Sequence, residues 1–152
     1  LSDYDYEVQL AQINKDISNN KVNTICLFAD NDYQFISSSV VKEVFNLNKE
    51  IYKNAKILPF VSLDQEGGMV ARVTEGITQS PGAMAISATN NPKNAYHLAY
   101  NMGKELQLLG FNFNFAPVGD INNNPKNPVI NVRSYSEDPD IVSALILPRA
   151  DA

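Results

Sequence analysis

The sequence predicts an α/β protein built on a parallel sheet. Helical and strand-like hydrophobic patterns alternate along the chain, and both long polar loops follow predicted strands. A length of 152 residues suits one domain, and 44% hydrophobic residues are enough to form a core. Ligands of parallel sheets bind at the carboxyl ends of the strands. We therefore expect any site to lie within residues 64–72 and 120–133.

The first 63 residues predict two successive helix–strand pairs. Apolar side chains recur at helical spacing over residues 6–17 and again over residues 40–51, which predicts two amphipathic helices. The segment 22–28 (VNTICLF) is short, apolar and rich in β-formers, as a buried strand should be. The segment 57–63 (ILPFVSL) predicts a second buried strand, although Pro59 cannot donate a ladder hydrogen bond.

A long loop and a well-delimited helix follow. Residues 64–91 are rich in Gly and Pro and predict an irregular loop, which at this length is usually functional. Asn91 can cap a helix whose first residue is Pro92. Apolar residues line one face over 95–109, and Gly110 stands where a helix commonly stops.

The last part of the chain predicts a third strand, a polar loop and a helix. Residues 112–118 (NFNFAPV) alternate polar and aromatic side chains, which indicates the strand, and residues 119–137 form the loop. Asp138 and Pro139 are suited to begin a helix. Pro148 is expected to end that helix early, because proline disrupts a helix interior.

Composition excludes several classes of function. A net charge of −5 argues against nucleic acid or an anionic membrane as the partner, and no segment approaches the roughly 20 apolar residues of a membrane span. The single cysteine, Cys26, excludes an internal disulfide and a multi-cysteine zinc site, and its mid-strand position predicts a core residue. The single histidine, His97, lies off the apolar stripe of its helix and is expected to be solvated or partly buried. The sequence contains no dinucleotide fingerprint, phosphate loop or histidine-based metal motif.

The first candidate site begins where the second predicted strand ends. Asp64 opens the motif DQEGG, and Arg72 follows it within the same loop. A carboxylate beside a tightly turning glycine pair can accept hydrogen bonds from ligand hydroxyl groups, and an arginine can donate a planar fork. The alternative is a charged surface turn in which Asp64 and Arg72 pair with each other.

The second candidate site follows the third predicted strand. Asp120 lies just past the end of that strand, and it either contacts a ligand or caps the asparagine-rich turn at 122–124. Arg133 has no helical face to occupy in the predicted loop. It is either a buried tie between loops or a ligand contact, and the spacing of the residues does not separate these two roles.

Four segments in the same order resemble glycoside hydrolase family 3. These segments are DQEGGMVARV, SPGAMAISAT, NFNFAPVGDINNNPKNPV and RSYSEDP. Within that family, the glutamine and glutamate of DQEGG are similar to the β-N-acetylhexosaminidases of bacterial cell-wall recycling. The resemblance is strongest over residues 58–140 and fades after about residue 144. Met69 replaces a commonly basic residue of the family, and Asn131 stands where a glycine is usual.

The resemblance implies a fold and a set of sugar-binding residues. The family's N-terminal domain is a TIM (β/α)8 barrel, so 1–152 is expected to be a partial barrel domain with about three of the eight βα units. Asp64 falls on the position that contacts hydroxyl groups of a terminal N-acetylglucosamine, and Arg72 and Arg133 fall on positions that orient this sugar. Asp120 matches the carboxylate that follows the third strand.

The resemblance also implies what lies outside the chain. The family's aspartate nucleophile and the histidine–aspartate acid/base of this subgroup have no match, so no catalytic residue is expected in the chain. No metal or organic cofactor is implied. The expected partner is a carbohydrate that contains N-acetylglucosamine, and association of the chain with itself is possible. A bacterial cytoplasmic location and a secreted or cell-wall location both stay open. The alternative to an enzyme is an inactive sugar-binding or structural fragment.

Overall fold

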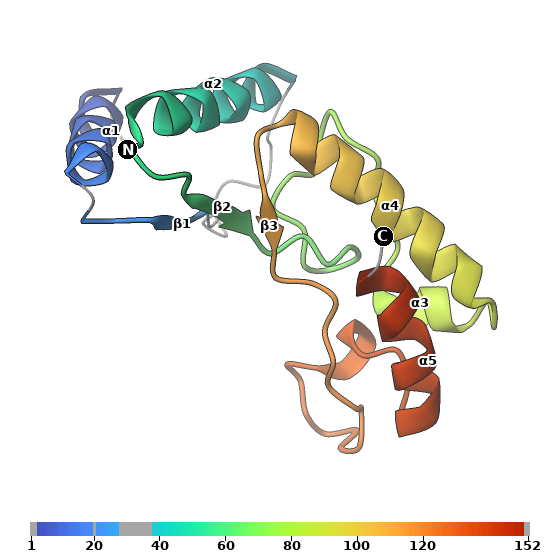
Figure 1. Ribbon diagram of the computed structural model, residues 1–152. Helices are drawn as coiled ribbons and strands as arrows, with labels where there is room; N and C mark the ends of the chain where they lie inside the picture. Colours follow the sequence, from blue (N-terminus) through green and yellow to red (C-terminus); the bar gives the residue numbers. More distant parts are fainter. Residues whose placement is uncertain (1–2, 20, 28–37, 151–152) are drawn as a thin grey trace.

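The computed structural model describes residues 3–19, 21–27 and 38–150. Helices and strands alternate through most of this part of the chain (Figure 1). The elements are α1 (Asp3–Ser18), β1 (Thr24–Leu27), α2 (Ser38–Asn54), β2 (Phe60–Leu63), α3 (Ala83–Ser87), α4 (Pro92–Leu108), β3 (Phe113–Asn114), the 3-10 helix η1 (Asn131–Arg133) and α5 (Pro139–Ala150).

The sheet contains three parallel strands in the order β1-β2-β3. Cys26 of β1 lies opposite Ser62 of β2, and Leu63 of β2 lies opposite Asn114 of β3. The predicted parallel α/β architecture is therefore confirmed. Since all strands run in one direction, the loops that follow β2 and β3 leave the same edge of the sheet, which is where the candidate site was expected.

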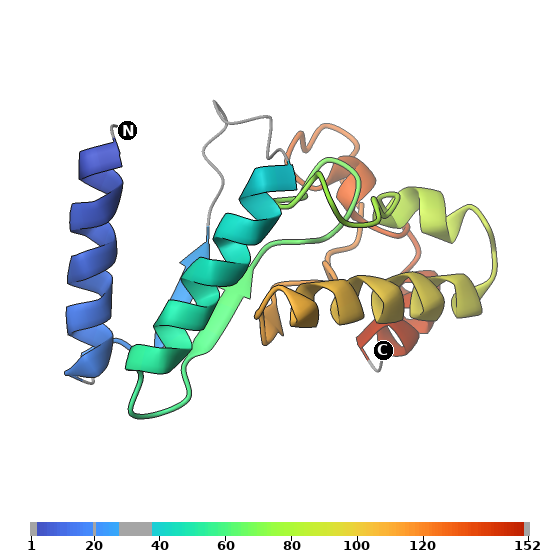
Figure 2. The same cartoon turned by 90° about the horizontal axis from the view of Figure 1, so that it is seen from above.

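Among the described residues, the helices that pack on the sheet cover one face of it. Figures 1 and 2 show α1, α2 and α4 around the sheet, whereas α3, η1 and α5 gather beyond β3. On the opposite face, Phe60, Phe113 and Phe115 form edge-to-face pairs and are 55%, 44% and 50% exposed. The covered face buries a cluster formed by Ile17, Ile51, Val61, Leu63, Val73, Met102, Leu106, Leu109 and Phe111.

The strands are shorter than predicted, because side-chain amides replace part of the ladder between β2 and β3. The amide of Asn112 accepts a hydrogen bond from the Val61 N–H (2.8 Å) and donates to the Pro59 carbonyl (2.9 Å). The amide of Asn114 bonds in the same way to the N–H (2.9 Å) and carbonyl (3.0 Å) of Gln65. The alternation of asparagine and phenylalanine was correctly read as extended chain, but only two of its residues form the strand.

The predicted ends of two further elements can be compared with the structure. Phe28, the last residue of the first predicted strand, lies outside the described residues. Asn91 caps α4 by accepting from the Lys93 N–H (3.1 Å), and Pro92 is the first residue of that helix, as predicted. Gly110 follows the helix with a φ of 89°, which confirms it as the stop residue.

The prediction for the last helix was right at its start and wrong at its end. The Asp138 carboxylate accepts from the Asp140 N–H (2.8 Å) and caps α5. However, α5 runs to Ala150 with Pro148 inside it. A proline removes one backbone hydrogen bond, and here the loss falls in the last turn. That turn is anchored instead by the buried side chain of Arg149.

Three smaller features also bear on the sequence predictions. The long loop predicted at 64–91 contains a short helix, α3. The five residues of α3 are too few to show a periodic pattern in the sequence. His97 is exposed on α4, in line with its expected solvated position. Cys26 is half-buried rather than a core residue.

Candidate functional site

The loop after β2 is closed by one buried amide side chain. Gln65 is 1% exposed, and its carbonyl oxygen accepts from the N–H groups of Arg72 (2.7 Å) and Val73 (3.1 Å). Its amide nitrogen donates to the Val73 carbonyl (2.8 Å). These bonds hold the backbone of Arg72 beside the end of β2, so the Arg72 side chain starts close to Asp64.

The glycine pair that follows brings this loop against α3. Gly67 and Gly68 have φ values of 93° and 62°, a region that side chains disfavour. The Gly68 N–H donates to the Ser80 carbonyl (2.8 Å). A Cβ added to Gly68 would lie 2.8 Å from the Cα of Gly82, so two backbones cross here at a distance that only glycine permits.

Asp64 and Arg72 form the first ion pair of the candidate site. The Arg72 Nη2 lies 3.0 Å from the Asp64 Oδ2. Their side chains are 24% and 25% exposed, so the pair is neither sealed in the core nor fully in solvent. The alternative in which these residues pair with each other is thus what the structure contains. A pair that is part-exposed at a strand end also remains within reach of a ligand.

Arg133 ties the second loop to the first. Its Nε lies 2.9 Å from Glu66 Oε2 and its Nη2 lies 2.7 Å from Glu66 Oε1, so the guanidinium and the carboxylate meet side-on. A third bond runs from Nη1 to the Val129 carbonyl (3.1 Å). Glu66 is 8% exposed, whereas the Arg133 side chain is 27% exposed. Arg133 is therefore a tie between loops, as one alternative predicted, and part of it also faces solvent.

Electrostatic attraction links three of the four predicted residues, Asp64, Asp120 and Arg133. The pKa of the Arg133 guanidinium is raised, first by its hydrogen bonds to Glu66, while partial burial acts in the opposite direction. The carboxylates of Glu66, Asp120 and Asp64 raise this pKa further by attraction. Asp64 and Asp120 therefore both lie within electrostatic range of Arg133.

Of the two alternatives for Asp120, the turn cap is not found among the described residues. The backbone carbonyl of Asp120 accepts from the Ser134 hydroxyl (2.6 Å), and Asp120 is exposed. The asparagine-rich turn is capped instead by Asn124, which accepts from the Lys126 N–H (3.1 Å). The Asp120 carboxylate acts on Arg133 through electrostatic attraction.

Sequence reasoning missed a buried arginine at the end of α5. Arg149 is 5% exposed and donates to the Tyr135 hydroxyl (3.1 Å) and to the Glu66 carbonyl. Burial raises the pKa of Tyr135, and the nearby Arg149 acts against this rise. No sequence signal marked Arg149, because it follows Pro148 in a segment that was expected to be irregular. Glu66 lay in a recognised motif but had no assigned role.

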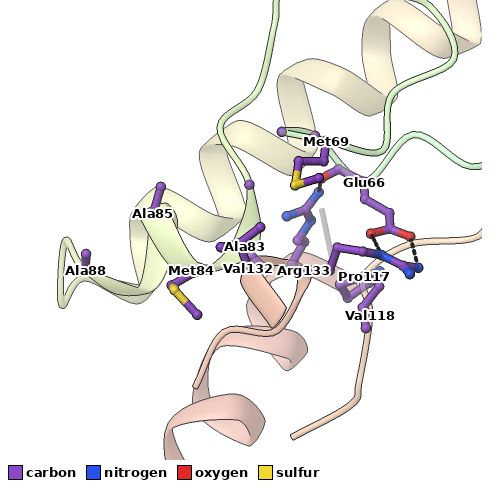
Figure 3. A pocket seen from close by; sticks show the side chains of 14 residues that line it. Glu66, Met69, Ala83, Met84, Ala85, Ala88, Pro117, Val118, Val132 and Arg133 are labelled. Atoms are coloured by element: carbon purple, nitrogen blue, oxygen red, sulfur yellow. Dashed lines mark hydrogen bonds and ion pairs between the residues drawn. The ribbon is translucent and has the colours of Figure 1, made fainter. Parts of the chain in front are cut away.

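A cavity of about 370 Å³ adjoins this network. The charged residues that line this cavity are Glu66, Arg133 and Arg149. Figure 3 shows Glu66 and Arg133 joined at one side of the cavity. The rest of the wall is largely apolar and includes Met69, Met84, Pro117, Val118 and Val132. Of the four predicted site residues, Arg133 lines this cavity, while the pair of Asp64 and Arg72 lies outside its wall.

The described part of the chain contains neither a metal-ligand cluster nor a membrane-spanning helix. Residues 3–19, 21–27 and 38–150 contain no group of three or more His, Cys, Asp or Glu placed to hold a metal ion. Within the same residues, every helix is too short or too polar to cross a membrane.

Comparison with known proteins identifies the family. Residues 7–151 match the model of the glycosyl hydrolase family 3 N-terminal domain. The chain is 42% identical over 142 residues to beta-hexosaminidase A of Pseudoalteromonas piscicida, a match that covers 90% of this chain and 23% of the relative. It is 31% identical over 130 residues to beta-hexosaminidase LpqI of Mycobacterium tuberculosis, covering 84% of this chain and 31% of LpqI. The chain thus spans less than a third of these curated relatives.

Solved structures agree with the sequence comparisons. A family 3 beta-N-acetylglucosaminidase from Paenibacillus sp. str. FPU-7 superposes with a TM-score of 0.80 at 38% identity, over 92% of this chain and 27% of that one. The structure of M. tuberculosis LpqI superposes with a TM-score of 0.77 at 30% identity, over 93% of this chain and 40% of that one. The predicted partial TIM barrel is thereby confirmed. The chain belongs to glycosyl hydrolase family 3 and matches its N-terminal domain.

Proposed function

We propose that this chain supplies sugar-binding residues to a retaining β-N-acetylhexosaminidase. The substrate class is peptidoglycan fragments or chitooligosaccharides that end in β-N-acetylglucosamine. The names of the relatives support a hexosaminidase activity, and the Paenibacillus protein is described as a beta-N-acetylglucosaminidase. The nucleophile and the acid/base lie outside the chain in this proposal, because the family segments that carry them have no match here.

The observation that carries the proposal is a pair of arginine–carboxylate contacts at the expected edge of the sheet. The contact between Asp64 and Arg72 follows β2, and the contact between Glu66 and Arg133 joins the loop after β2 to the loop after β3. Carboxylate oxygens accept hydrogen bonds from sugar hydroxyls, and guanidinium groups donate to hydroxyl or acetamido oxygens. Two such groups held side by side can fix both the position and the orientation of a pyranose ring.

Each residue then has a separate binding role. Asp64 accepts hydroxyl hydrogen bonds, and Arg72 holds its carboxylate in place from the other side. Arg133 donates to the sugar, with Asp120 adding negative charge near it. Retaining glycosidases need a nucleophile and an acid/base about 5 Å apart. Asp64 and Glu66 are already engaged by arginines, which suits binding better than nucleophilic attack.

The second candidate function is an inactive sugar-binding or structural fragment. It would use the same residues for binding without hydrolysis. The absence of any matching nucleophile segment in the sequence favours it for the 152 residues taken alone. The two candidates differ in one measurable property, which is turnover when the remaining parts of a family 3 enzyme are supplied.

A hybrid enzyme tests the proposal. This chain would replace the matching segment of the Paenibacillus beta-N-acetylglucosaminidase, and release of nitrophenol from a nitrophenyl N-acetylglucosaminide would be measured. We expect turnover, and we expect Asp64→Ala to lower kcat/KM by roughly 10- to 150-fold, as for a lost hydrogen bond to a charged group. A folded hybrid without turnover would contradict the enzymatic proposal. Unchanged kinetics in a folded Asp64→Ala hybrid would remove Asp64 from the site.

Arg72 needs a second measurement, because it also holds the loop. If Arg72 only ties the loop, Arg72→Ala should lower the melting temperature and leave kcat/KM largely intact. If it orients Asp64 toward a sugar, kcat/KM should fall with a smaller effect on melting. For Asp64→Ala, exposed Glu137 provides a charge-matched comparison, since Glu137→Gln also removes a carboxylate and touches neither ion pair.

A further inference from the structure

We propose that Glu66 is a positioning residue that selects the orientation in which Arg133 meets the sugar. This inference rests on the proposed function, because it assigns how one of the proposed binding residues is held. Neither the sequence motifs nor the resemblance gave Glu66 a role. The evidence for this role is the geometry of the ion pair between Glu66 and Arg133 and the surroundings of the Glu66 carboxylate.

The first step concerns which donors of Arg133 remain for a ligand. A guanidinium group has five N–H donors. Glu66 takes the Nε donor and one Nη2 donor, and the Val129 carbonyl takes one Nη1 donor. Within the described part of the chain, two donors therefore remain, one on each terminal nitrogen. They lie on the edge of the guanidinium away from the Nε–Nη2 side that Glu66 holds, so Glu66 decides where that edge points.

The second step concerns why Glu66 can act as a fixed reference. Its residue is 8% exposed, and the Glu66 N–H donates to the Val70 carbonyl (2.9 Å). The Glu66 carbonyl accepts from Arg149, which is itself 5% exposed and anchored on Tyr135. The backbone of Glu66 is thus held from both sides. The backbone of Glu66 is fixed by hydrogen bonds, and its carboxylate is paired side-on with Arg133. Such a side chain loses little further conformational freedom when a ligand binds.

The third step is the competition between carboxylates. Asp64 and Asp120 also attract Arg133, as their contributions to its raised pKa show. Both are more exposed than Glu66, and Asp64 already holds Arg72. Without the Glu66 carboxylate, the guanidinium can turn toward either of these groups while the loops remain folded. We therefore expect loss of Glu66 to misplace Arg133 more than it unfolds the site.

The experiment uses the hybrid enzyme with three variants. In Glu66→Gln, the amide keeps the shape but presents one donor to the guanidinium, and we expect KM to rise roughly tenfold or more with a smaller change in kcat. Glu66→Asp keeps the charge and should recover part of the loss. In the double variant Glu66→Gln/Arg133→Gln, kcat/KM should match that of Arg133→Gln alone, because Glu66 acts through Arg133.

Glu105 offers a matched control on α4. Its carboxylate also accepts two hydrogen bonds, from the Thr78 N–H (2.8 Å) and the Thr78 hydroxyl (2.7 Å), and it ties a loop as Glu66 does. Glu105→Gln should lower the melting temperature without raising KM. Equal KM values for the Glu66→Gln, Glu105→Gln and unchanged hybrids, alongside a defective Arg133→Gln, would overturn the positioning role and leave the proposed function standing.

A second readout follows Arg133 directly and does not need turnover. In the hybrid enzyme labelled with ¹⁵N-arginine, the Arg133 Nε–H should exchange slowly with solvent, because it is hydrogen-bonded to a carboxylate. Glu66→Gln should speed this exchange, and Glu105→Gln should not. Fast exchange of the Arg133 Nε–H in the unchanged, folded hybrid would overturn the inference even if that hybrid is inactive. An inactive hybrid with a slowly exchanging Nε–H would instead count against the proposed function alone.

Discussion

The close crossing of two backbones beside the site yields a graded prediction about glycines. Replacing Gly68 by alanine would place a Cβ 2.8 Å from the Cα and 2.9 Å from the nitrogen of Gly82. Replacing Gly82 would place a Cβ 3.7 Å from the Cα of Gly68, which is an ordinary contact. Replacing Gly103 in the middle of α4 would place a Cβ with no neighbour within 4 Å. The same change from glycine to alanine therefore places a methyl group in three different environments.

The expected free energies follow from these distances and from the backbone angles. Gly68 has a φ of 62°, and an alanine there costs about 1–2 kcal/mol for the left-handed conformation. The contact with backbone adds about 1–3 kcal/mol, as overpacking does. Gly82→Ala should cost about 0.5–1 kcal/mol, because alanine is a poorer helix N-cap than glycine. Gly103→Ala should stabilise by about 0.5–1 kcal/mol, because glycine in a helix interior is unfavourable.

Thermal unfolding of the hybrid enzyme and its three variants measures this series. We expect the melting temperatures to rank in the order Gly103→Ala, unchanged protein, Gly82→Ala and Gly68→Ala, with a clear gap before the last. Because the Gly68 loop carries Glu66, the same variant should also lose activity at temperatures where it remains folded. A Gly68→Ala protein as stable as Gly103→Ala would refute the argument from close approach.

Four further outcomes can be tested. The chain alone should release no nitrophenol from a nitrophenyl N-acetylglucosaminide above a mock purification, because it carries no matched nucleophile. Gln65→Leu should lower the free energy of unfolding by about 2–4 kcal/mol in denaturant titrations of the hybrid, since it leaves buried backbone groups unpaired. Asn131 has a φ of 37°, so Asn131→Gly should leave thermal stability unchanged or raised, and Asn131→Val should cost about 1–2 kcal/mol. In sedimentation velocity, the chain alone should associate through β3, which pairs only with β2 among the described strands; a concentration-independent monomer with a cooperative thermal transition would contradict this.

The order of elements was predictable because it depends on local patterns. Helical spacing, the cap at Asn91 and the stop at Gly110 each act over a few residues, and the structure confirms them. The continuation of α5 past Pro148 was not predictable, because tertiary contacts of Arg149 with Tyr135 and Glu66 offset the local cost of proline. Asn131 was noted as a departure from glycine, and its positive φ gives the physical reason that glycine suits this position.

The location of the candidate site was more predictable than its internal contacts. Strand ends and residue types led to Asp64, Arg72, Asp120 and Arg133. Electrostatic attraction links Asp64 and Asp120 to Arg133, and an ion pair links Arg72 to Asp64. The pairing of Asp64 with Arg72 was one of two alternatives, whereas the partner of Arg133 could not be predicted, because Glu66 lies 67 positions away along the chain. Spacing alone leaves open whether a charged loop residue meets another residue or a ligand. In this site, three side chains form ion pairs with other residues and remain part-exposed: Asp64, Arg72 and Arg133.

A chain of polar side chains links the sheet to the candidate site. The Asn114 amide fixes the backbone of Gln65, the Gln65 amide fixes the backbone of Arg72, and Arg72 holds Asp64. The first two steps use a side chain to bond a backbone group, which has fewer rotatable bonds than a second side chain, and the last step joins two side chains. The position of Asp64 is therefore set by the register of β2 and β3 rather than by the loop's own flexibility. This dependence explains why β3 needs only two strand residues: Asn114 contributes more by orienting the loop after β2 than by extending the ladder.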